Sequence, residues 1–162
     1  MELKLHVVPV VNEGEYNCIF GQSHFIKTVE DLYEVLVTSS PCIKFGLAFC
    51  EASGPRMIRT DGNDEEMQAL ALRAAQDVAC GHTFFIFMKD AYPINVLNGV
   101  KGCPEVCRIF AATANPLSVI VAEQGDARGV LGVLDGLKPL GVEDEKAKED
   151  RLNLLKMIGY KR

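Results

Sequence analysis

The sequence predicts an α/β fold: a single compact domain over residues 1–162, with a mixed β-sheet that is antiparallel in its C-terminal part and flanked by helices. The composition supports one globular domain, because the 162 residues are 48% hydrophobic and 24% charged. Segments with helical spacing of apolar residues alternate with short apolar segments that are typical of strands. The last three of these short segments are joined by connections too short for a crossover helix, which indicates antiparallel pairing.

The first part of the chain combines short strands with one helix. Residues 2–8 carry Leu3, Leu5 and Val7 on one face, which predicts a half-buried edge strand. A helix begins at Thr28, whose side chain can accept hydrogen bonds from the first-turn amides. We expect three further strands on either side of this helix: 17–21, 43–50 and 57–60.

The middle of the chain contains the clearest helix and the most buried strand. Residues 64–80 begin with acidic side chains, repeat apolar residues at helical spacing and end at Gly81, which is typical of a helix with a glycine stop. Residues 84–88 are apolar on both faces, which predicts a central strand covered on two sides. A short helix should follow over residues 93–100.

The last part of the chain should form a strand meander and a helix. Residues 106–112, 117–122 and 130–134 are the three apolar segments with short connections. A charged stretch then leads into a C-terminal helix, about 143–158, which carries a single apolar stripe.

Composition and motifs exclude several classes of function. The net charge is −5 and the basic residues are scattered, so the protein repels a nucleic-acid backbone. No run approaches the roughly 20 apolar residues of a membrane span. The six cysteines form no CxxC pair, and most lie in or beside apolar runs, which favours reduced thiols in the cytoplasm and no metal site. The Walker A, GxGxxG and GxSxG patterns are absent.

Polar residues gather where the predicted strands end. They are Glu51, Lys89, Asp90, Thr113, Asn115 and the segment 21–24. Because ligands bind outside the carboxyl ends of strands in open α/β sheets, we expect these residues to share one pocket. His24 is the strongest catalytic candidate, since it precedes Lys27 and a helix start that can meet an anion. The alternative is a loop histidine that only makes a capping bond.

Six blocks of the sequence resemble the family of adenosine-specific kinases: 21–32, 43–54, 61–64, 93–98, 104–110 and 112–116. The resemblance itself extends over most of residues 1–136. The resemblance implies a compact α/β protein of the prokaryotic cytoplasm, assembled as a homo-oligomer (trimer or hexamer), that binds adenosine or adenosine monophosphate (AMP). It also implies a phosphorylatable histidine, a role that we carry onto His24.

A hypothesis for the site combines both lines of reasoning. His24 takes up a phosphoryl group and passes it to adenosine, with Lys27 and Asp90 as the other catalytic candidates. The candidates for nucleoside binding are polar residues that can bond the adenine edge or the ribose: Glu51, Asp61, Asn63, Asp64, Asn95, Asn98, Thr113 and Asn115. No metal ligand is assigned. Asp61, Asp64 or Asp90 are the alternatives for holding Mg²⁺ with a phosphate donor, and no other cofactor is expected.

Two other classes of function fit the same sequence. The protein can be a sensor or carrier that binds adenine nucleotide without turnover, which activity with a phosphate donor would separate from a kinase. It can also be a structural oligomer whose polar loops only make subunit contacts, and this predicts no stabilisation by ligand.

Overall fold

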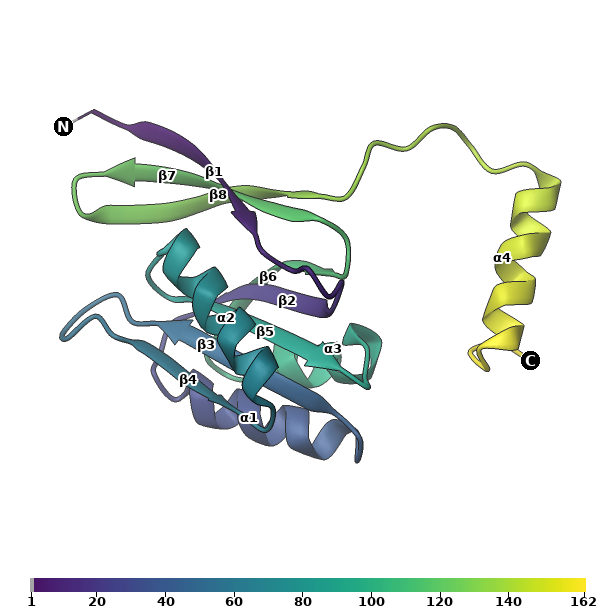
Figure 1. Ribbon diagram of the computed structural model, residues 1–162, viewed down its shortest axis with the longest axis horizontal. Coiled ribbons are helices and arrows are strands. Elements are labelled where there is room, and N and C mark those ends of the chain that lie inside the picture. Colours follow the sequence, from purple (N-terminus) through teal and green to yellow (C-terminus); the bar gives the residue numbers. More distant parts are fainter. Residues whose placement is uncertain (1) are drawn as a thin grey trace.

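The structure is a computed structural model that describes residues 2–162 (Figure 1). Its strands are β1 (Lys4–Val10), β2 (Asn17–Ser23), β3 (Lys44–Cys50), β4 (Ile58–Gly62), β5 (Thr83–Lys89), β6 (Val106–Thr113), β7 (Leu117–Gln124) and β8 (Ala127–Asp135). Its helices are α1 (Thr28–Ser39), α2 (Glu65–Val78), α3 (Pro93–Gly102) and α4 (Glu145–Met157). These elements confirm the predicted α/β class and the expected order of strands and helices. The predicted three-strand meander is wrong, because β6 pairs with β2 in one sheet while β7 pairs with β1 and β8 in the other.

The strands form two sheets. The larger has five strands in the order β4-β3-β5-β2-β6, and the smaller has three in the order β1-β7-β8. Every pairing among the described residues is antiparallel. The sequence predicts a mixed sheet, whereas the structure has two antiparallel sheets. The physical reason lies in β5. Helix α1 joins β2 to β3, which run in the same direction, but β5 lies between them and is antiparallel to both.

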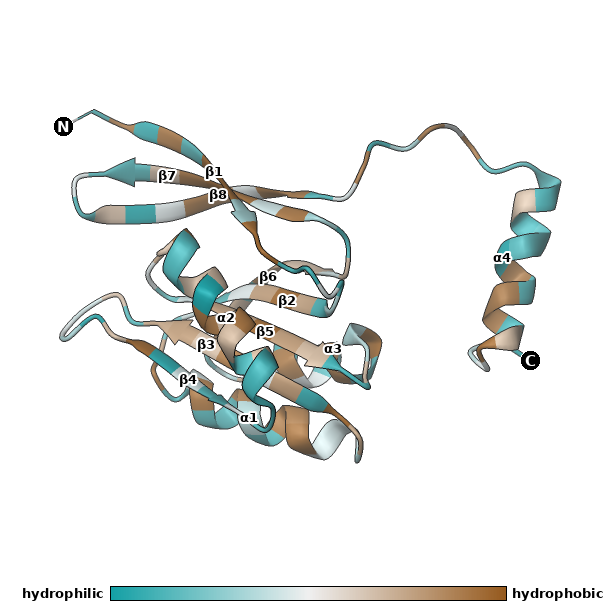
Figure 2. Cartoon of the chain, viewed as in Figure 1, coloured by the Kyte–Doolittle hydropathy of each residue, from teal (hydrophilic) through white to brown (hydrophobic). Residues whose placement is uncertain are grey.

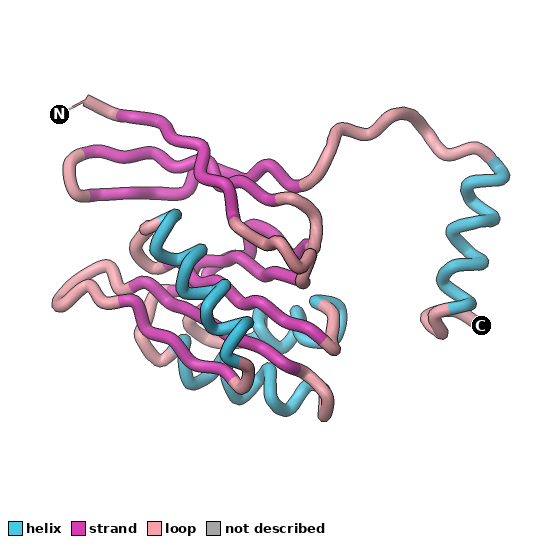
Figure 3. Tube along the Cα trace, viewed as in Figure 1, coloured by secondary structure: helices cyan, strands magenta, loops and turns pink. Residues whose placement is uncertain are grey.

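Helices and the smaller sheet cover the larger sheet on both faces (Figure 3). Helices α1 and α3 pack on one face against Phe45, Leu47 and Phe84. Helix α2 and the smaller sheet pack on the other face, where the rings of Phe20 and Phe85 stack with centroids 4.3 Å apart. The residues of β5 from Thr83 to Met88 are all buried, which confirms the predicted central strand.

Strand β1 faces the opposite way from the prediction. Leu3, Leu5 and Val7 are exposed, and Val8 and Val10 pack inward instead. The register explains this, because Val8 pairs with Val119, which is fully buried over α2. The apolar face that the alternation assigns to the core is therefore the outer face of the smaller sheet.

The C-terminal segment, residues 136–162, stands away from the rest of the protein (Figure 1). It consists of an extended linker followed by α4, and no residue of α4 is buried. Figure 2 shows that apolar residues nevertheless occur along it. We call this segment the C-terminal arm. Within residues 2–162, no helix has both the length and the apolar character needed to cross a membrane.

Candidate functional site

The antiparallel topology separates the predicted site residues into two groups. Strands β2 and β3 end, and β4, β5 and β6 begin, at one edge of the larger sheet. His24 and Glu51 lie at this edge, which we call the His24 edge. Asp90 and Asn115 lie at the opposite edge, roughly 20 Å away along the seven residues of β5. The single shared pocket that the sequence predicts does not form, because the ends of antiparallel strands alternate between the two edges.

The backbone at the His24 edge is fixed by bonds between neighbouring strands. The His24 N–H donates to the carbonyl oxygen of Glu105 at 3.0 Å, and the Ser23 N–H donates to the carbonyl oxygen of His82 at 2.8 Å. The His82 N–H donates to the carbonyl oxygen of Cys50 at 2.7 Å. His24 itself is exposed. The site therefore offers an accessible imidazole on a backbone tied to the strands on either side.

Helix α1 begins directly after His24, but Thr28 does not cap it. The residue before the helix is Lys27, and Thr28 is buried inside the first turn. The Thr28 hydroxyl donates to the carbonyl oxygen of Phe25 at 2.5 Å and lies 2.5 Å from the Ser23 hydroxyl. Thr28 thus ties the loop to the end of β2, and the predicted capping role is wrong.

A lysine and two carboxyl groups lie beside this loop. The Lys27 Nζ atom donates to both Asp31 carboxylate oxygens, at 2.5 and 2.7 Å. This contact raises the pKa of Lys27 and lowers the pKa of Asp31. Glu105 is only 4% exposed, and its Oε1 atom has no hydrogen-bond partner among the described residues. Burial, and then the nearby Asp31 carboxylate, raise the pKa of Glu105.

Glu105→Gln should make the protein more stable at neutral pH. A buried carboxyl with a raised pKa stabilises the fold below its ordinary value of 4.5 and loses that contribution as the pH rises through the folded-state pKa. Glutamine resembles the protonated form and does not ionise. The melting temperature of the variant minus that of the wild type should therefore grow from pH 4.5 to pH 8. A difference that stays constant over this range would mean that the pKa of Glu105 is not raised in the folded state.

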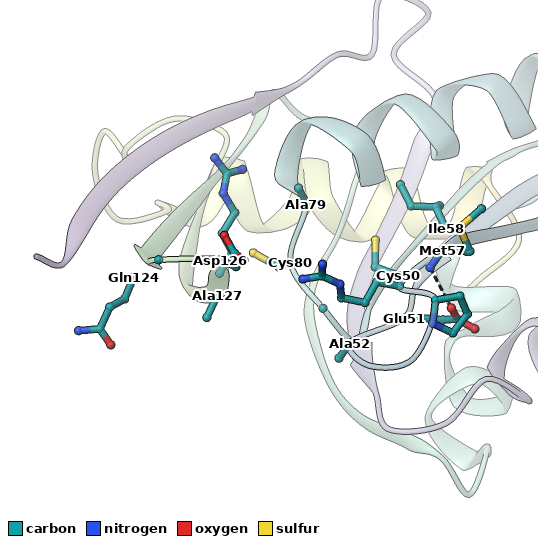
Figure 4. Close-up of a pocket in the computed structure, with 15 residues that line it drawn as sticks. Cys50, Glu51, Ala52, Met57, Ile58, Ala79, Cys80, Gln124, Asp126 and Ala127 are labelled. Carbon is teal, nitrogen blue, oxygen red and sulfur yellow. Dashed lines mark hydrogen bonds between the residues drawn. The ribbon is translucent and has the colours of Figure 1, made fainter. Parts of the chain in front are cut away.

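A pocket opens at the same edge, on the side of α2 and the smaller sheet. It has a volume of about 800 Å³, within the usual range for small-molecule sites. Figure 4 shows Gln124, Asp126 and Ala127 of the β7–β8 turn on one side, and Glu51 and Met57 of the β3–β4 connection on the other. Gly81, which directly precedes His82, also lines the pocket. The pocket wall is therefore joined to the backbone that holds His24.

Glu51 is a nucleoside-binding candidate that does line this pocket. Its Oε2 atom accepts the Met57 N–H at 2.8 Å, and its Oε1 atom accepts from Arg59 Nη2 at 3.0 Å. These two contacts, in that order, lower the pKa of Glu51. A charged carboxylate with remaining lone pairs can accept hydrogen bonds from ribose hydroxyls.

The two thiols in the pocket are poor nucleophiles. Burial raises the pKa of the Cys80 thiol to about 11 and also raises the pKa of Cys50. Both therefore stay protonated at neutral pH, and their sulfur atoms contribute apolar surface to the pocket beside Met57 and Ile58. Arg56 and Arg128 supply positive charge to the same pocket, and this combination suits a flat base attached to a polar sugar or phosphate.

At the opposite edge, the side chains of Asn63 and Asp64 make hydrogen bonds to the backbone of neighbouring segments. Asn63 Oδ1 accepts the Phe45 N–H at 2.9 Å, and its Nδ2 donates to the Ile43 carbonyl at 2.9 Å. Asp64 caps α2 through the Met67 N–H and pairs with Lys89 at 3.1 Å. These contacts give both side chains a structural role in the fold.

The other candidates away from the His24 edge are also involved in turns or lie exposed. Asp61 accepts the Gly62 N–H at 2.8 Å, and Asn95 accepts the Tyr92 N–H at 2.9 Å at the start of α3. Thr113 accepts the Asn115 N–H at 3.0 Å. Asn98 is exposed on α3, and Asp90 is exposed with a positive φ of 60°. Across residues 2–162, no group of three or more histidine, cysteine or acidic side chains is arranged to hold a metal ion.

Sequence reasoning misses three residues of the His24 edge. Glu105 and Arg56 carry no recognisable motif, although Glu105 lies in one of the blocks that resemble the kinase family. His82 directly precedes β5, and the amino end of an antiparallel β5 lies beside the carboxyl ends of β2 and β3.

The fold and this edge define a small α/β protein that presents an exposed histidine, a lysine and a helix start at the same edge of the sheet as a pocket large enough for a nucleoside, although neither His24 nor Lys27 lines that pocket. The chain belongs to the adenosine specific kinase family, whose sequence model matches residues 8–161. A solved relative is described as the crystal structure of PH1918 protein from Pyrococcus horikoshii OT3. It is 43% identical, the match covers 99% of each chain, and the TM-score is 0.94. Among curated proteins, no match was found.

Proposed function

We propose that this protein transfers a phosphoryl group to adenosine through a phosphorylated His24. Family membership supports an adenosine-related function. The observation that carries the proposal is the location of His24, which is exposed at the end of β2 and is tied through Ser23 and His82 to the wall of the 800 Å³ pocket. Lys27 follows His24 by three residues and can neutralise phosphoryl oxygens once it leaves Asp31.

Adenosine binds in the pocket between the β3–β4 connection and the β7–β8 turn. The base lies against the apolar wall of Met57 and Ile58, and Glu51 accepts hydrogen bonds from the ribose. Arg56 is exposed on the β3–β4 connection and can reach a phosphate of AMP. The remaining nucleoside-binding candidates and Asp90 are outside this arrangement, because they lie at the other edge of the larger sheet or on α3.

The transfer takes two displacements. An imidazole nitrogen of His24 attacks the terminal phosphorus of a phosphoanhydride donor, so that a nitrogen–phosphorus bond forms and the anhydride oxygen–phosphorus bond breaks. The 5′-hydroxyl oxygen of adenosine then attacks the same phosphorus, the nitrogen–phosphorus bond breaks, and AMP leaves. The hydroxyl proton passes to water, since a loose transition state needs little base assistance.

The protein works in the cytoplasm as a homo-oligomer, a trimer or a hexamer. The exposed C-terminal arm and the exposed apolar face of the smaller sheet support assembly of several copies.

A thermal-shift titration tests the nucleoside pocket. At about 100 times the dissociation constant, adenosine or AMP should stabilise the protein by roughly 2.7 kcal/mol and raise the melting temperature by about 5 to 10 °C. Guanosine, inosine and uridine should give no shift. Glu51→Gln should raise the ligand concentration needed for the same thermal shift roughly tenfold, because it removes the charged acceptor in the pocket.

Asp61→Asn is the matched control, since Asp61 lies at the opposite edge and asparagine keeps the acceptor for the Gly62 N–H. Equal loss of the shift in both variants would count against the pocket. A shift that both adenosine and AMP produce, without turnover of any phosphoanhydride, would favour the sensor or carrier instead.

A further inference from the structure

The outer face of the smaller sheet is apolar and exposed. Leu3, Leu5 and Val7 are 60%, 64% and 61% exposed. The register sets Ile120 beside Val7 and aligns Leu134 with Ser118 on the same face. Leu134 is 52% exposed, so the apolar surface continues across the three strands. A contiguous patch of this kind is uncommon on a monomer and marks an interaction surface.

The C-terminal arm carries a second set of exposed apolar side chains. In its linker, Leu137, Leu140 and Val142 are almost fully exposed. Leu154 and Met157 of α4, and Ile158 directly after it, recur at the spacing of one helix face and are at least 49% exposed. Figure 2 shows the apolar half of α4 lying far from the body of the protein. An amphipathic helix normally buries such a stripe against another part of the protein or a partner.

The same separation exists in a crystal structure of a relative. The match with the Pyrococcus horikoshii protein covers 99% of this chain with a TM-score of 0.94. The arm, residues 136–162, is too large a share of the chain for the score to be that high if the arm lay elsewhere in the relative. The arm therefore extends away from its own body in both proteins, and its apolar residues need a covering surface outside that body.

We propose that the arm of each copy packs its apolar face onto the outer face of the smaller sheet of a second copy. The arm starts at the end of β8, beside the sheet, and its linker of residues 136–144 can span up to about 30 Å when extended. Each chain supplies one arm and one outer face, so exchange between copies leaves neither exposed. Head-to-tail contacts of this type close into a ring when the rotation between copies allows it.

Charged substitutions in the full-length chain test this assembly. Leu5→Lys with Val7→Lys, or Leu154→Lys with Met157→Lys, should weaken self-association roughly a hundredfold or more, because each removes two buried apolar contacts. Sedimentation velocity should then show monomers at concentrations where the wild type is assembled. Ile94→Lys is the matched control, since Ile94 is 68% exposed on α3 but lies outside both surfaces.

Cross-linking of the wild type tests the docking surface even if a variant folds poorly. A lysine-reactive cross-linker on mixed light- and heavy-isotope protein should join Lys4 at the rim of the outer face to Lys148 or Lys156 of α4 in a different copy. A wild type that sediments as a monomer would overturn the proposal, and so would arm cross-links to any other surface. Adenosine binding measured on the same samples reports on the proposed function separately, because neither surface includes the pocket residues.

Discussion

Replacing His24 by alanine should lower acid-labile phosphate on the protein roughly a thousandfold or more when it is incubated with a labelled phosphoanhydride donor. The imidazole nitrogen is the atom that bonds to phosphorus in the proposed mechanism, and alanine offers no nucleophile at that position. His24 is exposed, and its backbone bond to Glu105 does not depend on the side chain. The variant should therefore fold normally and keep the melting temperature of the wild type within a few degrees.

His82→Asn is the matched control at the same edge. His82 has a positive φ of 64°, which asparagine tolerates, and its ring stacks 6.2 Å from Phe49. The labelling should survive this change, although some stability is lost with the ring contact. Label that persists in the His24 variant and disappears in the His82 variant would make His82 the phosphorylated residue. Full labelling of both would remove histidine chemistry from this edge.

Local patterns in the sequence are sufficient to predict the helices and the central strand. Helix α2 has an acidic start and an apolar stripe, and its burial follows that stripe. The predicted stop at Gly81 is wrong, because the helix ends at Val78 and Ala79 takes the left-handed conformation there. The apolar run in β5 correctly indicates burial on both faces. These predictions depend on residues close in the chain, which is where periodicity and capping carry information.

The sheet topology cannot be predicted in the same way. The direction of β5 relative to β2 and β3 depends on which strands pair, and residues far apart in the sequence decide that pairing. The same uncertainty affects β1. Its apolar residues alternate as the sequence predicts, but the side chains expected in the core face solvent. An alternating pattern identifies two faces of a strand, and only the tertiary packing decides which face is inside.

The candidate site is predictable in part for the same reason. His24 can be identified from the sequence because a lysine and a helix start follow it. No such local signal marks Glu105, because its surroundings include residues far away in the sequence, among them Asp31 of α1. Asn63 and Asp64 have side chains that suit ligand binding as well as turns and caps, and in the folded chain they make the hydrogen bonds of a turn and a cap.

Gly46→Ala should cost about 3 kcal/mol of unfolding free energy and lower the melting temperature by about 10 °C. A Cβ atom at Gly46 would overlap the backbone nitrogen of Gln68 and the carbonyl carbon of Met67. Both atoms belong to the backbone of α2, so no side-chain rotation relieves the clash. The helix itself must move away from β3.

Small residues on both partners make this close approach possible. Ala48 of β3 and Ala71, Ala74 and Ala75 of α2 are all buried in the same core. Lifting α2 away from β3 would also loosen Val78, from which the chain runs directly into the pocket wall at Ala79 and Gly81. We therefore expect Gly46→Ala to weaken the adenosine-induced thermal shift as well as the fold.

Gly102→Ala is the control, because a Cβ atom added there would have no heavy atom within 4 Å and the φ of Gly102 is not in the left-handed region. Its unfolding free energy should change by less than about 0.5 kcal/mol in urea titrations. If Gly46→Ala changed stability as little as this control, α2 would be free to shift away from β3 at low cost. A helix that shifts so easily could not hold the pocket wall in one position, and the pocket would then have to be formed by the ligand rather than by the fold.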